Sequence, residues 1–343
     1  MSWSEAAPRR LRRLLPPATI VTVSIGLTGC GSKQSILTTR SKPAHDIALL
    51  WWWMLAAAVV VFAGAVALLI VAWARRDTPG LPFFGEREDL SQGMVLLFGV
   101  GIPFVALVAL FGVSDVYLVG QTAPPNPRTT PMTIDVVGHQ WWWEVRYDGG
   151  RVDTANEIHI PVDTRVDVIA TTADVIHSFW VPALNRKIDM IPGITNRVLL
   201  YASAPGEYRG QCSQFCGVQH AHMSLEVFAQ RPAEFRAWLA GQERPAPAPL
   251  TARAQAGKQL FMTDQCASCH TIAGTPADGT VGPNLTHVAS RTTLAAAEIR
   301  NTPQELAAWI RDPQAIKPGD HMPDLGLSST AVSEIVAYLE ELR

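Results

Sequence analysis

One short segment of the sequence concentrates side chains that bind soft metal ions. The run Cys212-Ser-Gln-Phe-Cys216-Gly-Val-Gln-His220-Ala-His-Met223 offers two thiols, an imidazole and a thioether within a single loop. Thiolate and thioether ligands favour copper over a hard cation, and a blue-copper ion needs only one thiolate, two imidazoles and a weak Met ligand. The second cysteine exceeds that need and indicates two metal ions bridged by both sulfurs. The missing imidazole is expected from a neighbouring strand, and His177 is the best upstream candidate.

Two other interpretations of this segment stay open at this point. A Cys2His2 zinc site could use the same thiols and imidazoles, although it would not require Met223. A disulfide between Cys212 and Cys216 is conceivable if this part of the chain lies outside the cytoplasm. His139 and His222 are interpreted as ordinary, partly buried histidines rather than ligands.

A second motif, Cys266-Ala-Ser-Cys269-His270, is typical of covalent attachment of c-type haem. Two thioether bonds would fix the porphyrin, and His270 would be the proximal iron ligand. Half of a zinc site or a thioredoxin-like pair would share this pattern, but no second pair of cysteines accompanies it. Met322 is the only methionine after the motif, and a Met/His pair favours electron transfer at a raised reduction potential. The rival second ligands are His287 and His321.

Two kinds of element must position these motifs. Period-two alternation over short runs, from Met132 to about Gln230, predicts the many short strands of a β-sandwich or barrel. Residues 243–250 form a Pro-rich linker. Beyond it, Thr302-Pro303-Gln304-Glu305 has the form of a capping box, and apolar residues after Met322 recur at helical spacing. Residues 251–343 are therefore expected to form helices.

The composition indicates a membrane protein. The 343-residue chain is 48% hydrophobic and 17% charged, below the roughly 25% charge of an ordinary soluble domain. No charged residue occurs from Ile47 to Ala74 or from Leu90 to Ser114, and each run exceeds the ~20 residues that cross a bilayer. Two transmembrane helices, at about 47–74 and 91–114, are predicted. The net charge of −2 argues against a nucleic-acid binder that relies on a basic surface.

The loop between the two predicted helices indicates their orientation. Arg75, Arg76 and Arg87 place positive charge on residues 75–89, which the positive-inside tendency assigns to the cytoplasm. The sequence after about residue 120 is therefore expected on the extracytoplasmic side of a bacterial cell membrane.

The first 29 residues have the features of a signal peptide, with four arginines before a short apolar stretch. Leu27-Thr28-Gly29-Cys30 resembles a bacterial lipobox, and this resemblance implies a lipid-modified Cys30. Plain signal cleavage with an incidental cysteine is the alternative. The mature N-terminus is expected outside in either case.

The pattern Cys-x-x-x-Cys-x-x-x-His-x-x-Met resembles the binuclear copper (CuA) loop of cytochrome c oxidase subunit II. The segments 174–184, 187–193 and Gly138-His-Gln-Trp141-Trp-Trp143 are similar to further motifs of that family. The resemblance covers roughly residues 30–235 and implies a two-helix transmembrane hairpin before a cupredoxin-like β-barrel domain. Residues 251–343 resemble a small, all-α class I cytochrome c. The expected fold class is a multidomain membrane protein with these three parts.

This resemblance implies a role for each residue of the copper loop. Both coppers would be bridged by two thiolates, each would bind one imidazole, and a thioether and a backbone carbonyl would complete the site. The implied ligands are Cys212, Cys216, His177, His220, Met223 and the backbone carbonyl of Gln214. Trp141 would be the residue through which electrons reach the copper.

The sequence departs from the family at two positions. The family usually has Glu where Gln214 stands, and that carboxylate helps to bind magnesium; Gln lacks the charge, which leaves magnesium here doubtful. The second helix of the family commonly carries a Glu at a proton-channel entrance, where this sequence has Leu96.

The function implied is that of subunit II of a bacterial haem–copper cytochrome c oxidase with a fused cytochrome c domain. Electrons would pass from haem c to CuA and then to haem a of subunit I, where oxygen reduction coupled to proton pumping takes place. The partners implied are subunit I and other oxidase subunits, with an external cytochrome c or a quinol-cytochrome c reductase as donor. The alternative is a stand-alone membrane-anchored copper and haem module for electron transfer or redox sensing. A quinol-oxidase subunit II would lack the copper ligands.

The expected division of the chain is a signal peptide at 1–29, the hairpin region at 30–119, the CuA domain at 120–242, the linker at 243–250 and the cytochrome c domain at 251–343. Residues 120–242 hold 10 Lys and Arg against 12 Asp and Glu, and residues 251–343 hold 7 against 10. Because both domains are mildly acidic, we expect a linker of roughly 25 Å, rather than charge, to hold the haem near Trp141. The contact is expected to be mainly uncharged.

Overall fold

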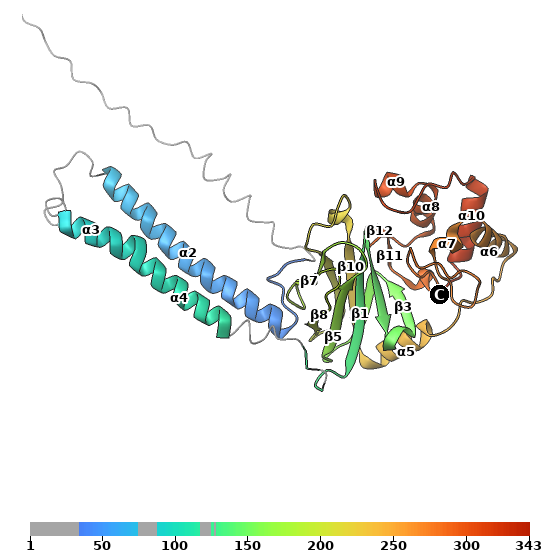
Figure 1. Cartoon of the computed structure of the whole chain (residues 1–343), viewed down its shortest axis with the longest axis horizontal. Coiled ribbons are helices and arrows are strands. Elements are labelled where there is room, and N and C mark those ends of the chain that lie inside the picture. Colours follow the sequence, from blue (N-terminus) through green and yellow to red (C-terminus); the bar gives the residue numbers. More distant parts are fainter. Residues whose placement is uncertain (1–33, 75–87, 117–124, 127) are drawn as a thin grey trace, which may run out of the picture.

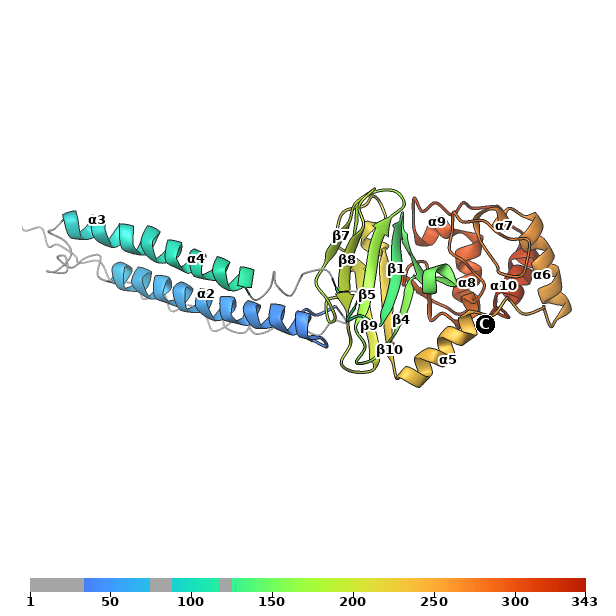
Figure 2. The same ribbon diagram turned by 60° about the horizontal axis from the view of Figure 1, so that its bottom comes forward.

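The computed structural model describes residues 34–74, 88–116, 125–126 and 128–343 (Figure 1). The predicted signal peptide, Cys30 and the three arginines of the interhelical loop lie outside the described residues. The described chain forms an extended helical hairpin, a central β domain and a helical C-terminal domain (Figures 1 and 2).

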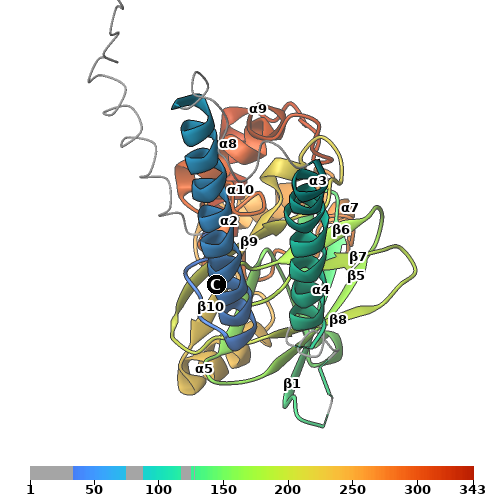
Figure 3. The ribbon, with the colours of Figure 1, turned by 90° about the vertical axis from the view of Figure 1, so that its left-hand side faces the viewer.

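Two long apolar rods form the N-terminal hairpin. The first is α2 (Lys42–Ala74), and the second joins α3 (Glu88–Leu96), the π-helical turn η1 (Leu97–Gly101) and α4 (Ile102–Ser114). The two rods run side by side and extend away from the β domain (Figures 2 and 3). Both have spans long and apolar enough to cross a bilayer, and the residues of those spans are exposed. Because such an apolar surface needs a nonpolar surrounding, the hairpin anchors the chain in a membrane.

The central domain is a sandwich of two five-stranded sheets, as the alternating sequence predicts. The first sheet has the order β3-β2-β1-β5-β8 and the second the order β4-β10-β9-β6-β7. The pairs β1–β5 and β4–β10 are parallel, and the other neighbours are antiparallel. The strands are β1 (Met132–His139), β2 (Trp142–Tyr147), β3 (Val152–Ala155), β4 (Glu157–Pro161), β5 (Val166–Thr172), β6 (His177–Trp180), β7 (Ile188–Met190), β8 (Asn196–Leu200), β9 (Gly206–Cys212) and β10 (Ser224–Gln230).

The two sheets enclose a single apolar core that fixes the loops at their ends. Alternate residues of each strand point inward, and Trp143 and Phe179 meet edge to face with ring centroids 6.0 Å apart. The buried hydroxyl of Tyr147 on β2 accepts a hydrogen bond from His159 N at 2.7 Å on β4 of the other sheet. This bond and the shared core hold the two sheets at a fixed separation.

The C-terminal domain is a small bundle of helices. Its elements are α6 (Ala252–Thr263), α7 (Cys266–Cys269), η5 (Val288–Ser290), β11 (Thr293–Leu294), β12 (Ile299–Arg300), α8 (Pro303–Arg311), α9 (Pro313–Ile316) and α10 (Ser329–Leu339). Thr302 caps α8 by accepting a hydrogen bond from Glu305 N, as the capping-box pattern predicts. The fold class expected from the sequence, a hairpin with a cupredoxin-like and a cytochrome c domain, is therefore confirmed.

The segment 243–250 follows α5 (Pro232–Gln242) and lies against the C-terminal domain. Ala246 N donates to Ala273 O at 3.0 Å, and Leu250 N donates to a carboxylate oxygen of Glu341 at 2.7 Å. The carbonyl of Arg244 accepts from His287 Nε2 at 2.9 Å. Because three of its backbone positions are bonded, the segment is a fixed strap rather than a free tether.

Gly257 allows α6 and α10 to cross closely, because a Cβ atom there would lie only 1.9 Å from Glu334 O. We expect Gly257→Ala to push the helices apart and to destabilise the C-terminal domain by about 1–3 kcal/mol. Thermal unfolding of the full-length chain in detergent measures this loss. Gly241→Ala on α5, where the added methyl would meet open space, is the matched control and should gain up to about 1 kcal/mol. Equal midpoints for the two variants would contradict the prediction.

Candidate functional site

The sulfur-rich loop is closed at its base by the β9–β10 hairpin. Cys212 is the last residue of β9, and its backbone N–H donates to Met223 O at 2.9 Å, immediately before β10. This bond brings together residues that are distant along the loop. The Cys216 Sγ atom lies 3.8 Å from Cys212 Sγ and 3.8 Å from Met223 Sδ. Three sulfur atoms therefore converge, and no disulfide joins the two cysteines.

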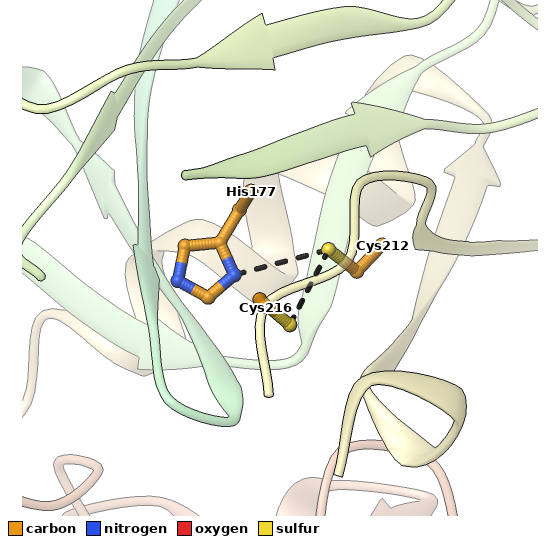
Figure 4. Close-up of side chains that lie close together, drawn as sticks. All are labelled: His177, Cys212 and Cys216. Carbon is orange, nitrogen blue, oxygen red and sulfur yellow. Dashed lines mark hydrogen bonds between the residues drawn. The ribbon is translucent and has the colours of Figure 1, made fainter. Parts of the chain in front are cut away.

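Two imidazoles complete the cluster. β6 pairs with β9 through Phe179 and Cys212, so His177 at the start of β6 lies beside the loop, with its Nδ1 3.8 Å from Cys212 Sγ. His220 Nδ1 lies 3.6 Å from Cys216 Sγ. Figure 4 shows the ring of His177 and the two sulfurs turned toward one another. Their ligand atoms all lie within 4.8 Å of one another.

The backbone carbonyl of Gln214 also faces the cluster, since its oxygen lies 3.1 Å from Cys212 Sγ. The structure thus brings together all six of the ligands that the sequence resemblance implied. A hydrogen bond with Cys216 lowers the pKa of the Cys212 thiol to about 4, and the same bond together with burial raises the pKa of Cys216. One of the two thiols is therefore already favoured as a thiolate, the form that binds a metal.

The orientation of His177 is set by residues outside the cluster. Its Nε2 lies 2.8 Å from Asp174 Oδ1, and the other carboxylate oxygen of Asp174 accepts from Gln140 N at 2.6 Å. Gly138 leaves room for the imidazole, because a Cβ there would lie 2.8 Å from its ring. Such outer partners fix the ring nitrogen that faces a metal. Sequence reasoning quoted the motifs containing Gly138 and Asp174 but assigned them no role.

Trp141 lies between the loop that contains Cys216 and the C-terminal domain. The residue is 5% exposed, and its indole Nε1–H donates to Cys216 O at 3.0 Å. Gln140 Nε2 donates to the same carbonyl at 2.7 Å. Gly217, the residue after Cys216, has a φ of +119°, and a Cβ atom there would lie 2.9 Å from the Trp141 ring. The glycine therefore permits direct contact of the loop with the indole.

A cavity in the C-terminal domain contains the second set of sequence-predicted residues. It is lined by Cys266, Cys269, His270 and Met322. Because the carbonyl of Pro283 can only accept, His270 Nδ1–H donates to it at 2.7 Å, which leaves Nε2 for another partner. Burial lowers the pKa of His270 and favours the neutral ring that binds iron.

The two rival iron ligands have different surroundings. His287 Nε2 is occupied by the carbonyl of Arg244, whereas His321 lines the cavity and its ring centroid lies 5.1 Å from that of Trp141. The neighbouring Met322 is held by Gln314 Nε2, which donates to its carbonyl at 2.9 Å. The other two histidines that the sequence left as non-ligands pair with acids: His139 with Glu144 and His222 with Glu298.

The cavity has one wall from the β domain, since Gln140, Trp141 and Trp142 also line it. The sequence predicted a mainly uncharged contact between the two domains. In the structure, however, the charged residues Glu157 and Lys317 are buried in this contact. The prediction was wrong because the net charge of a domain does not reveal single charges that bind the backbone of a partner.

The described chain is a membrane-anchored protein with a thiolate-rich cupredoxin-like domain and a cytochrome c domain. Residues 149–229 match the family model "Cytochrome C oxidase subunit II, periplasmic domain", and residues 254–343 match "Cytochrome c". The cytochrome c oxidase subunit 2 of Alkalihalophilus pseudofirmus is 34% identical over 284 residues, which is 81% of this chain and 81% of that protein. The chain belongs to the cytochrome c oxidase subunit 2 family, whose members are components of an oxidoreductase complex.

Two further proteins are similar to the chain. The cytochrome c oxidase subunit 2 of Bacillus subtilis is 26% identical over 346 residues, which is 94% of this chain and 95% of that protein. The crystal structure of the periplasmic domain of subunit II of cytochrome oxidase from Bradyrhizobium japonicum is 33% identical, with a TM-score of 0.33, and covers 35% of this chain and 96% of that domain.

Asp174 is expected to support copper binding through His177. Asp174→Asn keeps the shape of the side chain but weakens the hydrogen bond to the imidazole, so copper affinity should fall by about tenfold. Competition of the purified full-length chain with a chelator measures this affinity. Asp148→Asn, at an exposed turn, is the matched control and should leave the affinity unchanged. Equal affinities for the two variants would exclude a supporting role for Asp174.

Proposed function

We propose that this chain relays electrons one at a time from a covalent haem c to a binuclear CuA site, and from there to haem a of subunit I. Oxygen reduction coupled to proton pumping takes place in that partner. Membership of the oxidase subunit 2 family supports the proposal, as does the presence of both domains in one chain.

The chemistry of the donor set fits copper. Three sulfur atoms, two imidazoles and one carbonyl oxygen surround one buried site, and soft sulfur ligands favour copper. We assign Cys212 and Cys216 as bridging ligands, with one imidazole for each copper. The terminal ligands are His177, His220, Met223 and the carbonyl of Gln214. Magnesium is not part of the proposal.

The cavity of the C-terminal domain fits a covalent haem. Cys266 and Cys269 would form the two thioether bonds, and His270 and Met322 would supply the iron ligands. Gly282 supports this arrangement, because a Cβ there would lie 2.5 Å from the His270 ring and displace it. When bound, the haem iron would give up one electron as it passes from ferrous to ferric, and the copper pair would take up that electron.

The observation that carries the proposal is the place of Trp141. Trp141 lines the haem cavity, and its ring centroid lies 5.1 Å from that of His321, which also lines the cavity. Its indole N–H bonds to the carbonyl of Cys216. One buried side chain therefore contacts both candidate sites. We infer that Trp141 provides the path by which electrons reach the copper.

The remaining assignments extend this proposal. The CuA and cytochrome domains, residues 120–242 and 251–343, would lie on the extracytoplasmic side of a bacterial cell membrane. Cys30 would carry a lipid after removal of residues 1–29. An external cytochrome c or a quinol-cytochrome c reductase would supply the electrons. A stand-alone electron-transfer or redox-sensing module is the alternative, and co-purification of a polytopic subunit with a-type haem would exclude it.

The substitution Cys216→Ser tests the copper site independently of the haem site. The full-length wild-type chain should hold two coppers and one covalent haem, and the variant should lose the mixed-valence copper signal while the haem stays attached. Metal analysis with electron paramagnetic resonance measures the copper content and the mixed-valence signal. A haem stain on a denaturing gel measures the covalent attachment of the haem. Cys269→Ser should give the reverse result. A wild-type chain with one copper, or with zinc at full occupancy, would refute the copper assignment.

Trp141→Phe tests the electron path. The change removes the N–H bond to Cys216 O and shortens the aromatic bridge, so electron transfer from haem to copper should slow by about tenfold with both cofactors in place. Rapid kinetics after photoreduction of the haem measure the rate. Trp238→Phe on α5, where the ring packs on His159, is the control. An unchanged rate in Trp141→Phe would exclude this path.

A further inference from the structure

Three segments of the cytochrome domain form hydrogen bonds with the β domain. They are the start of β11 at Thr292 and Thr293, the turn Ala295–Ala297, and the segment after α9 from Lys317 to Pro318. Gln219 of the copper loop donates to Pro318 O at 2.6 Å. The contact therefore includes both β4 and the copper loop itself.

Glu157 on β4 holds the first segment. The residue is 3% exposed, and a single carboxylate oxygen accepts from Thr292 N at 2.6 Å, Thr292 Oγ1 at 2.7 Å and Thr293 N at 3.3 Å. A carboxylate bound by three donors in a buried site is held much more strongly than a neutral acceptor would be. The β domain thus uses a buried negative charge to bind the backbone of the cytochrome domain.

Lys317 holds the third segment, and here the charge belongs to the cytochrome domain and the bonded backbone to the β domain. The residue is 1% exposed, and its Nζ donates to Trp141 O at 3.0 Å and to Ala295 O at 3.4 Å. Asp320 balances its charge at 3.4 Å. The cytochrome domain thus uses a buried positive charge to bind the backbone of Trp141, the residue on the proposed electron path.

The turn Ala295–Ala297 lies between these two contacts. All three alanines have positive φ, between 53° and 62°, a conformation that residues other than Gly rarely adopt. Ala296 O accepts from Ser224 N at 3.2 Å, and Ala297 O accepts from Arg209 Nη1 at 3.2 Å. An unfavourable backbone persists only where its surroundings hold it in place, so this turn depends on the contact with the β domain.

We propose that Glu157 and Lys317 form a reciprocal pair of buried clamps that hold the cytochrome domain in one fixed orientation over Trp141. The proposal rests on the electron route proposed above and adds that no docking step precedes the transfer. Each clamp binds backbone atoms, which cannot adjust as side chains do. Glu157 binds the backbone at Thr292 and Thr293, and Lys317 binds the backbone at Trp141 and Ala295. Together with the strap at 243–250, these bonds restrain rotation of the cytochrome domain.

The first test follows the orientation without using the cofactors' reaction. Lys317→Met keeps the length and apolar stem of the side chain but removes the ammonium group. Amide exchange of the full-length chain should become about tenfold faster at Thr292, Thr293 and Ser224. The reason is that loss of the ammonium group leaves the buried Trp141 O without its hydrogen-bond donor, which weakens the contact between the domains. Exchange in α6 and α10 should not change. Wild-type exchange at the interface in the variant would overturn the clamp, and faster exchange throughout the domain would show a general folding role instead.

Two further variants make this test specific. Glu157→Gln keeps the shape and one acceptor but removes the charge, so the same amides should exchange about threefold faster. Lys258→Met, the same substitution on α6, should leave exchange at the interface as in the wild type. An equal effect of Lys258→Met would overturn the assignment to Lys317.

The second test measures the electron-transfer rate in the assembled oxidase. In the wild type, transfer from haem to copper should not depend on ionic strength or solvent viscosity. In Lys317→Met it should be about tenfold slower and should slow further with viscosity, because the domain must first reach its place. The haem spectrum and copper signal should be unchanged. A viscosity-dependent wild-type rate would overturn the clamp, whereas a wild type without CuA or haem would refute the proposed function and leave the exchange result valid.

Discussion

The turn that joins β1 and β2 holds both candidate sites through backbone carbonyls. Gln140 and Trp141 donate to Cys216 O from their side chains, and Trp141 O accepts from Lys317. The copper loop is therefore attached to Gln140 and Trp141, and the cytochrome domain is attached to Trp141. Because the β1–β2 hairpin belongs to the rigid core of the sandwich, the separation of the two sites follows from the fold and not from flexible side chains.

The contact between the domains uses charge at a considerable energetic cost. Burial alone would raise the pKa of Glu157, but the imidazole of His159, with its Nε2 3.8 Å from the carboxylate, and hydrogen bonds from Thr292 outweigh it and hold the pKa below its usual value. For Lys317 the balance is reversed: burial lowers the pKa although Asp320 opposes the shift. Replacing a whole buried ion pair by apolar side chains is often neutral or stabilising, whereas removing one partner is destabilising. We therefore interpret these charges as fixing an orientation rather than as adding stability.

The sequence was sufficient for features that are local. The proposed copper ligands from Cys212 to Met223 and the proposed haem-attachment motif from Cys266 to His270 each lie within one short segment, and periodicity separated the strands from the helices. His177 was found as the best upstream source of the missing imidazole, and the resemblance of its motif to that of a known family supported this choice. Lys317 and Glu157 had no such signal, since each acts on a backbone more than a hundred residues away, and an isolated Lys or Glu resembles any surface charge.

The predicted linker at residues 243–250 does more than span the distance between the two domains. A flexible linker would keep the haem domain near the copper at about millimolar effective concentration, and docking would then compete with rotation and release. The segment 243–250 is instead bonded along its length, and the surface of Trp141 is covered. A diffusing donor would therefore meet the cytochrome domain first, where Val281 lines the haem cavity and is 67% exposed. In the arrangement that we propose, electrons would reach the copper through a path assembled by folding, with no separate docking event.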